Sequence, residues 1–64
     1  MTKTEIYECV GKGGRYRKIL TAKPAGQATE PAVFYQCEST GETYWRYQWD
    51  FEQRMKLVCI KDEP

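Results

Sequence analysis

The segment from Ala32 to Tyr47, AVFYQCESTGETYWRY, is the clearest indication of the fold class. Its two ends, Ala32–Glu38 and Thr43–Tyr47, are rich in aromatic and β-branched residues, which are enriched in β-strands. Between them lies the short polar segment Ser39-Thr40-Gly41-Glu42, which is typical of a turn. The pattern therefore predicts an antiparallel β-hairpin.

Two more strands are expected before this hairpin, over Glu5–Val10 and Arg15–Ala22. Gly11-Lys12-Gly13-Gly14 separates them, because glycine readily adopts the positive φ values of tight turns. Lys23–Pro31, with a proline near each end, is expected to be a loop. Under the period of two, one face of the second strand is mostly apolar and is expected to point inward; its residues are Tyr16, Lys18, Leu20 and Ala22.

After the hairpin, the pattern predicts one short helical turn near residues 50–55, with Asp50 as a candidate cap. Lys56–Ile60 reads as a fifth strand, and Lys61–Pro64 as a frayed tail. A chain of 64 residues suffices for one domain, so we expect a single domain over 1–64 with an ordered core of about 5–60. The fold class is mainly β, either a small SH3-like barrel or a strongly bent five-stranded antiparallel sheet.

The three cysteines, Cys9, Cys37 and Cys59, are an odd number and are widely spaced. A complete set of intramolecular disulfides is therefore excluded, and we expect reduced thiols that pack as small apolar groups. The alternative is one bridge, Cys9–Cys59, if the terminal strands meet. Histidine is absent and there is no C-x-x-C pair, so no metal site is expected.

The net charge of +1 indicates neither a nucleic acid nor a membrane as partner. Without a signal-peptide core or a long apolar run, we expect a cytoplasmic protein. Gly11-Lys12-Gly13-Gly14-Arg15 superficially resembles a phosphate cradle, but it leads into a strand and has no Ser or Thr after the lysine, so it is interpreted as a turn. Since no histidine can serve as a base beside a nucleophile, we expect neither an enzyme nor a cofactor.

The aromatic stretch Tyr44–Trp49, YWRYQW, is the best candidate for a binding surface. Alternation places Trp45 and Tyr47 on the face opposite to Tyr44 and Arg46, and so small a domain cannot bury both faces. Exposed aromatic rings beside arginine are typical of binding hot spots and of base stacking. The alternative is a thin domain that exposes its rings without a partner. The residues predicted to bind are Trp45, Arg46, Tyr47 and Trp49.

A basic patch is also predicted on the second strand, where Arg15 and Arg17 share one face and Lys12 and Lys18 lie nearby. A patch of this size could make a few salt-sensitive contacts to phosphates. The alternative is an ordinary charged outer face that neighbouring acidic residues offset.

Three motifs give the chain a family resemblance. They are Lys12-Gly13-Gly14-Arg15-Tyr16, Val33-Phe34-Tyr35 and the segment from Tyr44 to Phe51. With these the chain resembles domain-of-unknown-function family 1653, whose small bacterial and phage members carry K-G-x-x-Y, V-V-Y and W-V-R-P-x-x-M-F. The chain departs from that pattern at Tyr47, where the family has proline, at Asp50, where it has methionine, and in lacking a histidine before Lys12-Gly13. The resemblance implies an SH3-like β domain and a phage or prophage origin, but no activity.

These observations favour a non-enzymatic protein-binding module, an accessory or inhibitor protein of a phage or prophage. The alternative is a nucleic-acid-binding module that uses the same aromatic residues together with Arg15, Arg17 and Lys18. The oligomeric state is left open.

Overall fold

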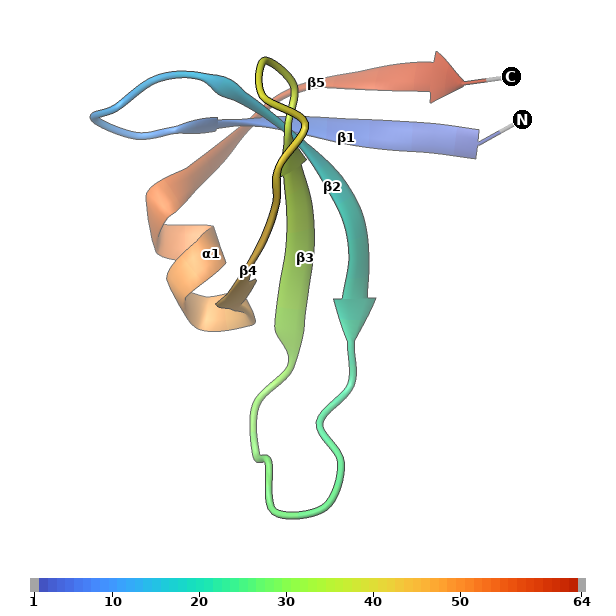
Figure 1. The fold of residues 1–64 in the computed structure, drawn as a ribbon, viewed down its shortest axis with the longest axis vertical. Helices are drawn as coiled ribbons and strands as arrows, with labels where there is room; N and C mark the ends of the chain where they lie inside the picture. Colours follow the sequence, from blue (N-terminus) through green and yellow to red (C-terminus); the bar gives the residue numbers. More distant parts are fainter. Residues whose placement is uncertain (1, 64) are drawn as a thin grey trace.

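The fold is one five-stranded antiparallel sheet with one short helix (Figure 1). A computed structural model describes residues 2–63. Across the sheet the strands are ordered β4-β3-β2-β1-β5, and the sheet is not closed into a barrel. Of the two predicted architectures, the bent open sheet is therefore correct and the barrel is not. The elements are β1 (Thr2–Cys9), β2 (Arg15–Ala22), β3 (Ala32–Cys37), β4 (Thr43–Tyr47), α1 (Gln48–Arg54) and β5 (Met55–Glu63).

The terminal strands are longer than predicted. Thr2 pairs with Glu63 and Thr4 pairs with Lys61, so backbone hydrogen bonds continue into polar segments at both ends of the chain. Residues 61–63 are therefore paired in the sheet and do not form the predicted frayed tail, while Pro64, the last residue of that prediction, lies outside the described residues. The amino-acid composition could not predict this pairing, because the hydrogen bonds between neighbouring strands join backbone groups and need no particular side chains.

The helix also starts earlier than predicted, at Gln48, whose N–H donates to the carbonyl of Pro31 at 2.9 Å. Tyr47 occupies the N-cap position and makes no side-chain cap bond. Asp50 lies inside the first turn and is not the cap.

Two β-bulges bend the sheet. The register shifts between Lys18 and Leu20 against β3, and between Ile6 and Tyr7 against β5. A bulge adds one residue to one strand, which increases the local twist and bends that strand. As a result, the β1–β5 pair runs crosswise to β3 and β4 (Figure 1).

The bulge in β2 reverses which side chains point inward. We call the side of the sheet that carries Val33, Tyr35 and Cys37 the helix face, and the opposite side the open face. Before the bulge, Tyr16 and Lys18 pair with Cys37 and Tyr35 on the helix face. After it, Leu20 and Ala22 pair with Phe34 and Ala32 on the open face. The predicted inward face is thus right for Tyr16 and Lys18 and wrong for Leu20 and Ala22.

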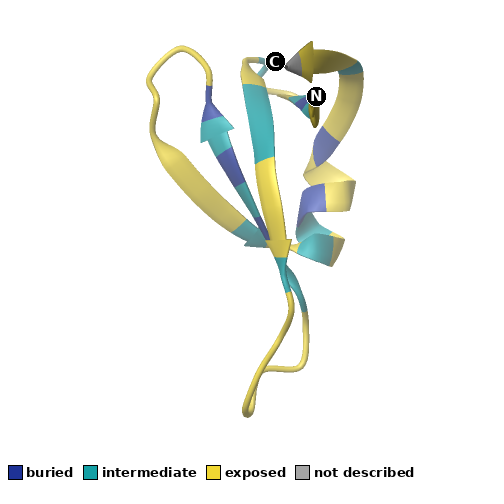
Figure 2. Cartoon of the chain, turned by 90° about the vertical axis from the view of Figure 1, so that its right-hand side faces the viewer, coloured by how far each residue is buried: buried dark blue, intermediate teal, exposed yellow. Residues whose placement is uncertain are grey.

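The main core lies between the helix face and α1. Phe51 contacts Tyr7 and Tyr35, with ring centroids 4.7 and 5.3 Å apart. Val33 and Met55 complete this buried cluster. Figure 2 shows that the buried residues gather on the sheet and on the inner side of α1, while the loop between β2 and β3 projects into solvent. The helix thus covers the helix face. On the open face Ile6 of β1 is also fully buried, whereas Leu20, Trp45 and Tyr47 stay exposed.

The three cysteines are free thiols. The terminal strands do pair, but Cys9 lies opposite Met55, whereas Cys59 lies opposite Ile6. Alternation along β1 then puts Cys9 on the helix face and Cys59 on the open face. The alternative Cys9–Cys59 bridge is therefore wrong.

Candidate binding site on the open face

Four large apolar side chains lie together on the open face of β2, β3 and β4. Leu20 pairs with Phe34, and Phe34 pairs with Trp45. Tyr47 lies two residues beyond Trp45 on the same face, and the two rings meet edge to face with their centroids 5.2 Å apart. We call Leu20, Phe34, Trp45 and Tyr47 the open-face patch.

The open-face patch is exposed to solvent. The exposed fractions are 51% for Leu20, 53% for Trp45 and 44% for Tyr47, while Phe34 is partly buried between its neighbours. Scattered single exposed apolar residues are ordinary, but a contiguous group of large ones marks a contact surface. Tyrosine and tryptophan are also the residue types enriched at such surfaces.

Arg46 lies on the other side of the sheet. It pairs with Val33 across β3 and β4, so its side chain points to the helix face. Its Nε donates to the hydroxyl of Tyr35 at 3.0 Å, and its Nη1 lies 2.9 Å from Oδ2 of Asp50. Arg46 therefore tethers the first turn of α1 to the sheet, away from Trp45 and Tyr47.

Asp50 is shared between two guanidinium groups. Its Oδ1 accepts from Nε of Arg54 at 2.8 Å, while Oδ2 accepts from Arg46. The two arginines, first Arg54 and then Arg46, hold the pKa of Asp50 below its ordinary value. The hydrogen bond that Arg46 donates to Asp50 in turn raises the pKa of Arg46. The carboxylate and both guanidinium groups are thus charged together at neutral pH.

Trp49 lies in the helix and not in the sheet that carries the open-face patch. It belongs to α1, which packs on the helix face, and it is 50% exposed. Of the four aromatic-stretch residues predicted to bind, the structure brings Trp45 and Tyr47 together and separates Arg46 and Trp49 from them.

Arg15 and Arg17, by contrast, lie on the open face. Arg17 pairs with Ile6 on one side and with Gln36 on the other, and Arg15 pairs with Glu8. They extend the open face from the patch toward the β1–β2 loop. Acidic residues lie at this end too, because Glu8 pairs with Arg15 and the Glu38 N–H donates to the Arg15 carbonyl at 3.0 Å. The basic patch is therefore mixed with carboxylates.

Sequence reasoning missed Leu20 as a surface residue. The sequence did carry a signal of this. Ile19 and Leu20 are consecutive apolar residues, and they follow Lys18, a charged residue that strict alternation places in the interior. A bulge at Ile19 explains both features. It keeps Lys18 beside Tyr35 on the helix face and moves Leu20 to the open face.

Cys37 has an unusual environment for a buried thiol. Its Sγ lies 3.2 Å from Oγ of Ser39, and hydrogen bonds from Ser39 and Thr40 lower its pKa to about 7. Within residues 2–63, no group of three or more acidic or cysteine side chains is arranged to hold a metal ion. Nor does this part of the chain contain a helix with the length and hydropathy to cross a membrane.

Comparison with known proteins finds no match among family models, curated proteins or solved structures. The resemblance to family 1653 therefore stays a prediction.

Proposed function

We propose that the protein is a non-enzymatic module that binds another protein through the open-face patch. The observation that carries this proposal is the position of Leu20, Phe34, Trp45 and Tyr47 on the face that α1 leaves uncovered. Rigid aromatic side chains on a sheet supply contact area with little loss of conformational entropy. The partner would present an apolar surface to them.

The overall dimensions support a protein partner. The accessible surface is 4903 Å², against about 4,250 Å² expected for a compact chain of this mass. The difference is of the order of the roughly 800 Å² that one partner buries in a standard interface. A phage or prophage accessory or inhibitor role is consistent with such a module and is part of the same proposal.

Nucleic acid is the second candidate partner, and one observation favours it. Arg15 and Arg17 lie on the same face as Trp45 and Tyr47, so phosphate contacts and base stacking could act together. Against it stand the net charge of +1 and the carboxylates of Glu8 and Glu38 at that end of the face.

The test compares Trp45→Ala with Trp49→Ala. These two tryptophans are exposed to nearly the same extent, but Trp45 lies on the open face of the sheet and Trp49 in α1, so they form a matched pair. Proteins captured from nuclease-treated bacterial lysate by the wild type are purified, and their affinities for both variants are measured. We expect Trp45→Ala to weaken binding by roughly 2 kcal/mol, as for a hot-spot residue, and Trp49→Ala to have little effect.

Two outcomes would decide against this proposal. Equal binding by both variants would remove the open-face patch from the interface. Loss of all capture after nuclease treatment, with affinity that falls steeply with salt and depends on Arg15, would favour the nucleic-acid alternative. Sedimentation of the isolated protein would show whether a second copy occupies the patch.

A further inference from the structure

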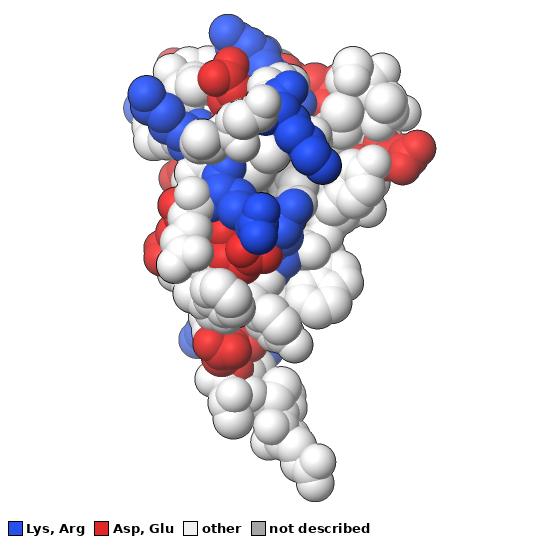
Figure 3. All heavy atoms as spheres, turned by 90° about the vertical axis from the view of Figure 1, so that its left-hand side faces the viewer, with Lys and Arg blue, Asp and Glu red and all other residues white. Residues whose placement is uncertain are grey.

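A cavity of about 210 Å³ opens on the helix face, between β4, the start of β5 and the β1–β2 loop. Figure 3 views the molecule from this side and shows basic side chains gathered around a hollow. Three tyrosine rings, two cationic groups and a thioether form most of its lining: Tyr16, Tyr35, Tyr44, Lys12, Arg46 and Met55. The open-face patch lies on the opposite side of the sheet, so this cavity has no part in the proposed function.

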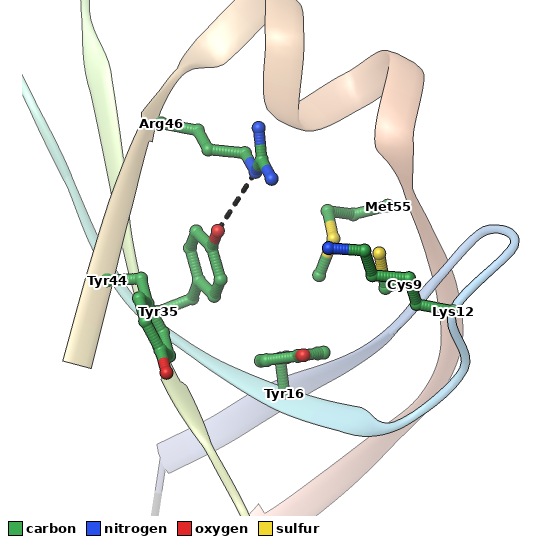
Figure 4. A pocket seen from close by; sticks show the side chains of 7 residues that line it. All are labelled: Cys9, Lys12, Tyr16, Tyr35, Tyr44, Arg46 and Met55. Carbon is green, nitrogen blue, oxygen red and sulfur yellow. Dashed lines mark hydrogen bonds between the residues drawn. The ribbon is translucent and has the colours of Figure 1, made fainter. Parts of the chain in front are cut away.

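The cationic groups come from different elements and reach toward the same space. Figure 4 shows the Arg46 side chain entering from β4 and the Lys12 side chain from the β1–β2 loop. No carboxylate lines the cavity. Two of the three nitrogens of the Arg46 guanidinium are occupied, Nε by Tyr35 and Nη1 by Asp50, whereas Nη2 has no partner in the described part of the chain.

The charge balance leaves the cavity positive. Asp50 is the acidic partner of both Arg46 and Arg54, so this group of three carries one net positive charge. Lys12 adds another, and none of the carboxylates whose side chains the structure describes pairs with it. Lysine and arginine together suit a compact dianion better than a single carboxylate, since each can donate to a different oxygen.

The tyrosines form a continuous aromatic wall. The ring centroids of Tyr16 and Tyr35 are 5.5 Å apart, and those of Tyr35 and Tyr44 are 5.9 Å apart. Such a wall suits a flat ring, which can meet the tyrosines edge to face. An apolar cavity of about 150 Å³ already admits benzene, whereas sites for drug-sized ligands start near 300 Å³. The cavity therefore has room for one ring and a small substituent.

We infer that this cavity binds a single aromatic ring that carries a phosphate group. The ring would lie against Tyr16 and Tyr44, and the phosphate would lie between Lys12 and Nη2 of Arg46. The site differs from a P-loop in two ways. The glycines around Lys12 lead into a strand, and the groups expected to bind the phosphate are side chains. The ligand could be a free aryl phosphate or a phosphotyrosine side chain, which present the same group.

The test is an NMR titration of the full chain with phenyl phosphate, inorganic phosphate and benzyl alcohol. We expect phenyl phosphate to bind more tightly than either of the others and to shift the resonances of Tyr16 and Tyr44. Lys12→Gln should weaken the binding of phenyl phosphate about tenfold, the loss expected for a charge-assisted hydrogen bond. Lys12 is exposed in a loop, so this change should leave the fold intact. The matched control is Lys23→Gln, an exposed loop lysine outside the cavity lining, which should change affinity less than twofold.

A second variant tests the contribution of the aromatic ring to binding separately from that of the phosphate. Tyr44→Leu, at an exposed edge of the wall, should weaken the binding of phenyl phosphate and leave the binding of inorganic phosphate unchanged. A phosphotyrosine peptide that binds more tightly than phenyl phosphate would identify a protein as the source, and equal affinity would identify the free compound. The inference is overturned if Lys12→Gln binds phenyl phosphate as the wild type does, or if benzyl alcohol binds equally well.

Discussion

The Arg46 guanidinium joins the sheet to the short helix. Beside Trp45 and Tyr47 in the sequence it looks like one member of a binding cluster. In the fold it points to the helix face and connects Tyr35 of β3 with Asp50 of α1. Its first role is therefore to hold the short helix on the sheet. A helix of seven residues needs such a tether, because isolated helices of that length are unstable in water.

The residue-scale prediction follows from these contacts. We expect Arg46→Ala to lower the free energy of unfolding by about 1–3 kcal/mol, because it removes hydrogen bonds of a charged group at a partly buried site. Arg54→Ala is the control: it removes a partner of the same Asp50 carboxylate, but from a side chain that is 62% exposed, and should cost less than about 1 kcal/mol. Urea unfolding followed by far-ultraviolet circular dichroism measures both. Equal stability of the two variants would contradict the tethering role.

At the scale of elements, the bulge in β2 determines which surface the protein presents. Without it, Leu20 would lie on the same side as Tyr16 and Lys18, and Thr21 would be on the outer side. With it, Thr21 pairs with Val33 on the helix face, and Leu20 pairs with Phe34 on the open face. The extra residue thus places Leu20, in the position that Ile19 would otherwise take, beside Phe34 in the open-face patch.

The corresponding prediction compares two truncations of aliphatic side chains. We expect Leu20→Ala to change the free energy of unfolding by no more than about 0.5 kcal/mol, the range for surface substitutions. Ile6→Ala, at a fully buried position, should cost about 2–5 kcal/mol and lower the melting temperature sharply. Thermal and urea unfolding of both variants provide the measurement. If Leu20→Ala proves as costly as Ile6→Ala, Leu20 faces inward and the bulge is misplaced.

At the scale of the whole molecule, the protein is thin for its length. Its principal extents are 34 × 32 × 19 Å, and its radius of gyration is 12.2 Å, against about 10.7 Å for a compact domain of this length. One helical layer on one side of a bent sheet buries few side chains. The main buried cluster contains only Val33, Tyr35, Phe51 and Met55. This small core explains why large apolar residues remain on the surface and why a partner would add much to stability.

The whole-molecule prediction concerns the thiols. We expect the melting temperature to be the same with and without reductant, within about 2 °C, because the register keeps Cys9 and Cys59 on opposite faces. A native disulfide typically contributes 2–4 kcal/mol, which in so small a domain corresponds to a shift of roughly 10 °C or more. Differential scanning calorimetry in both buffers makes the comparison, and thiol titration of the unfolded chain provides the control. A shift of that size on reduction would show a bridge.

Local structure could be predicted from the pattern of residues along the chain. Composition and turn residues placed β2 and β4 within their observed bounds and predicted the hairpin of β3 and β4. Alternation along β4 also correctly put Trp45 and Tyr47 opposite Arg46. These features depend on the period of two and on glycine-rich turns, which act over a few neighbouring residues.

The surfaces that those residues form depend on the three-dimensional fold. The bulge at Ile19, the pairing of the two chain ends and the position of α1 over one face all depend on contacts between residues distant in the sequence. For the same reason Lys12 and Arg46, which come from separate elements, meet at one cavity only in the folded chain. A strand pattern shows which residues share a face, but the partner strands determine the register, and the register determines which face is covered.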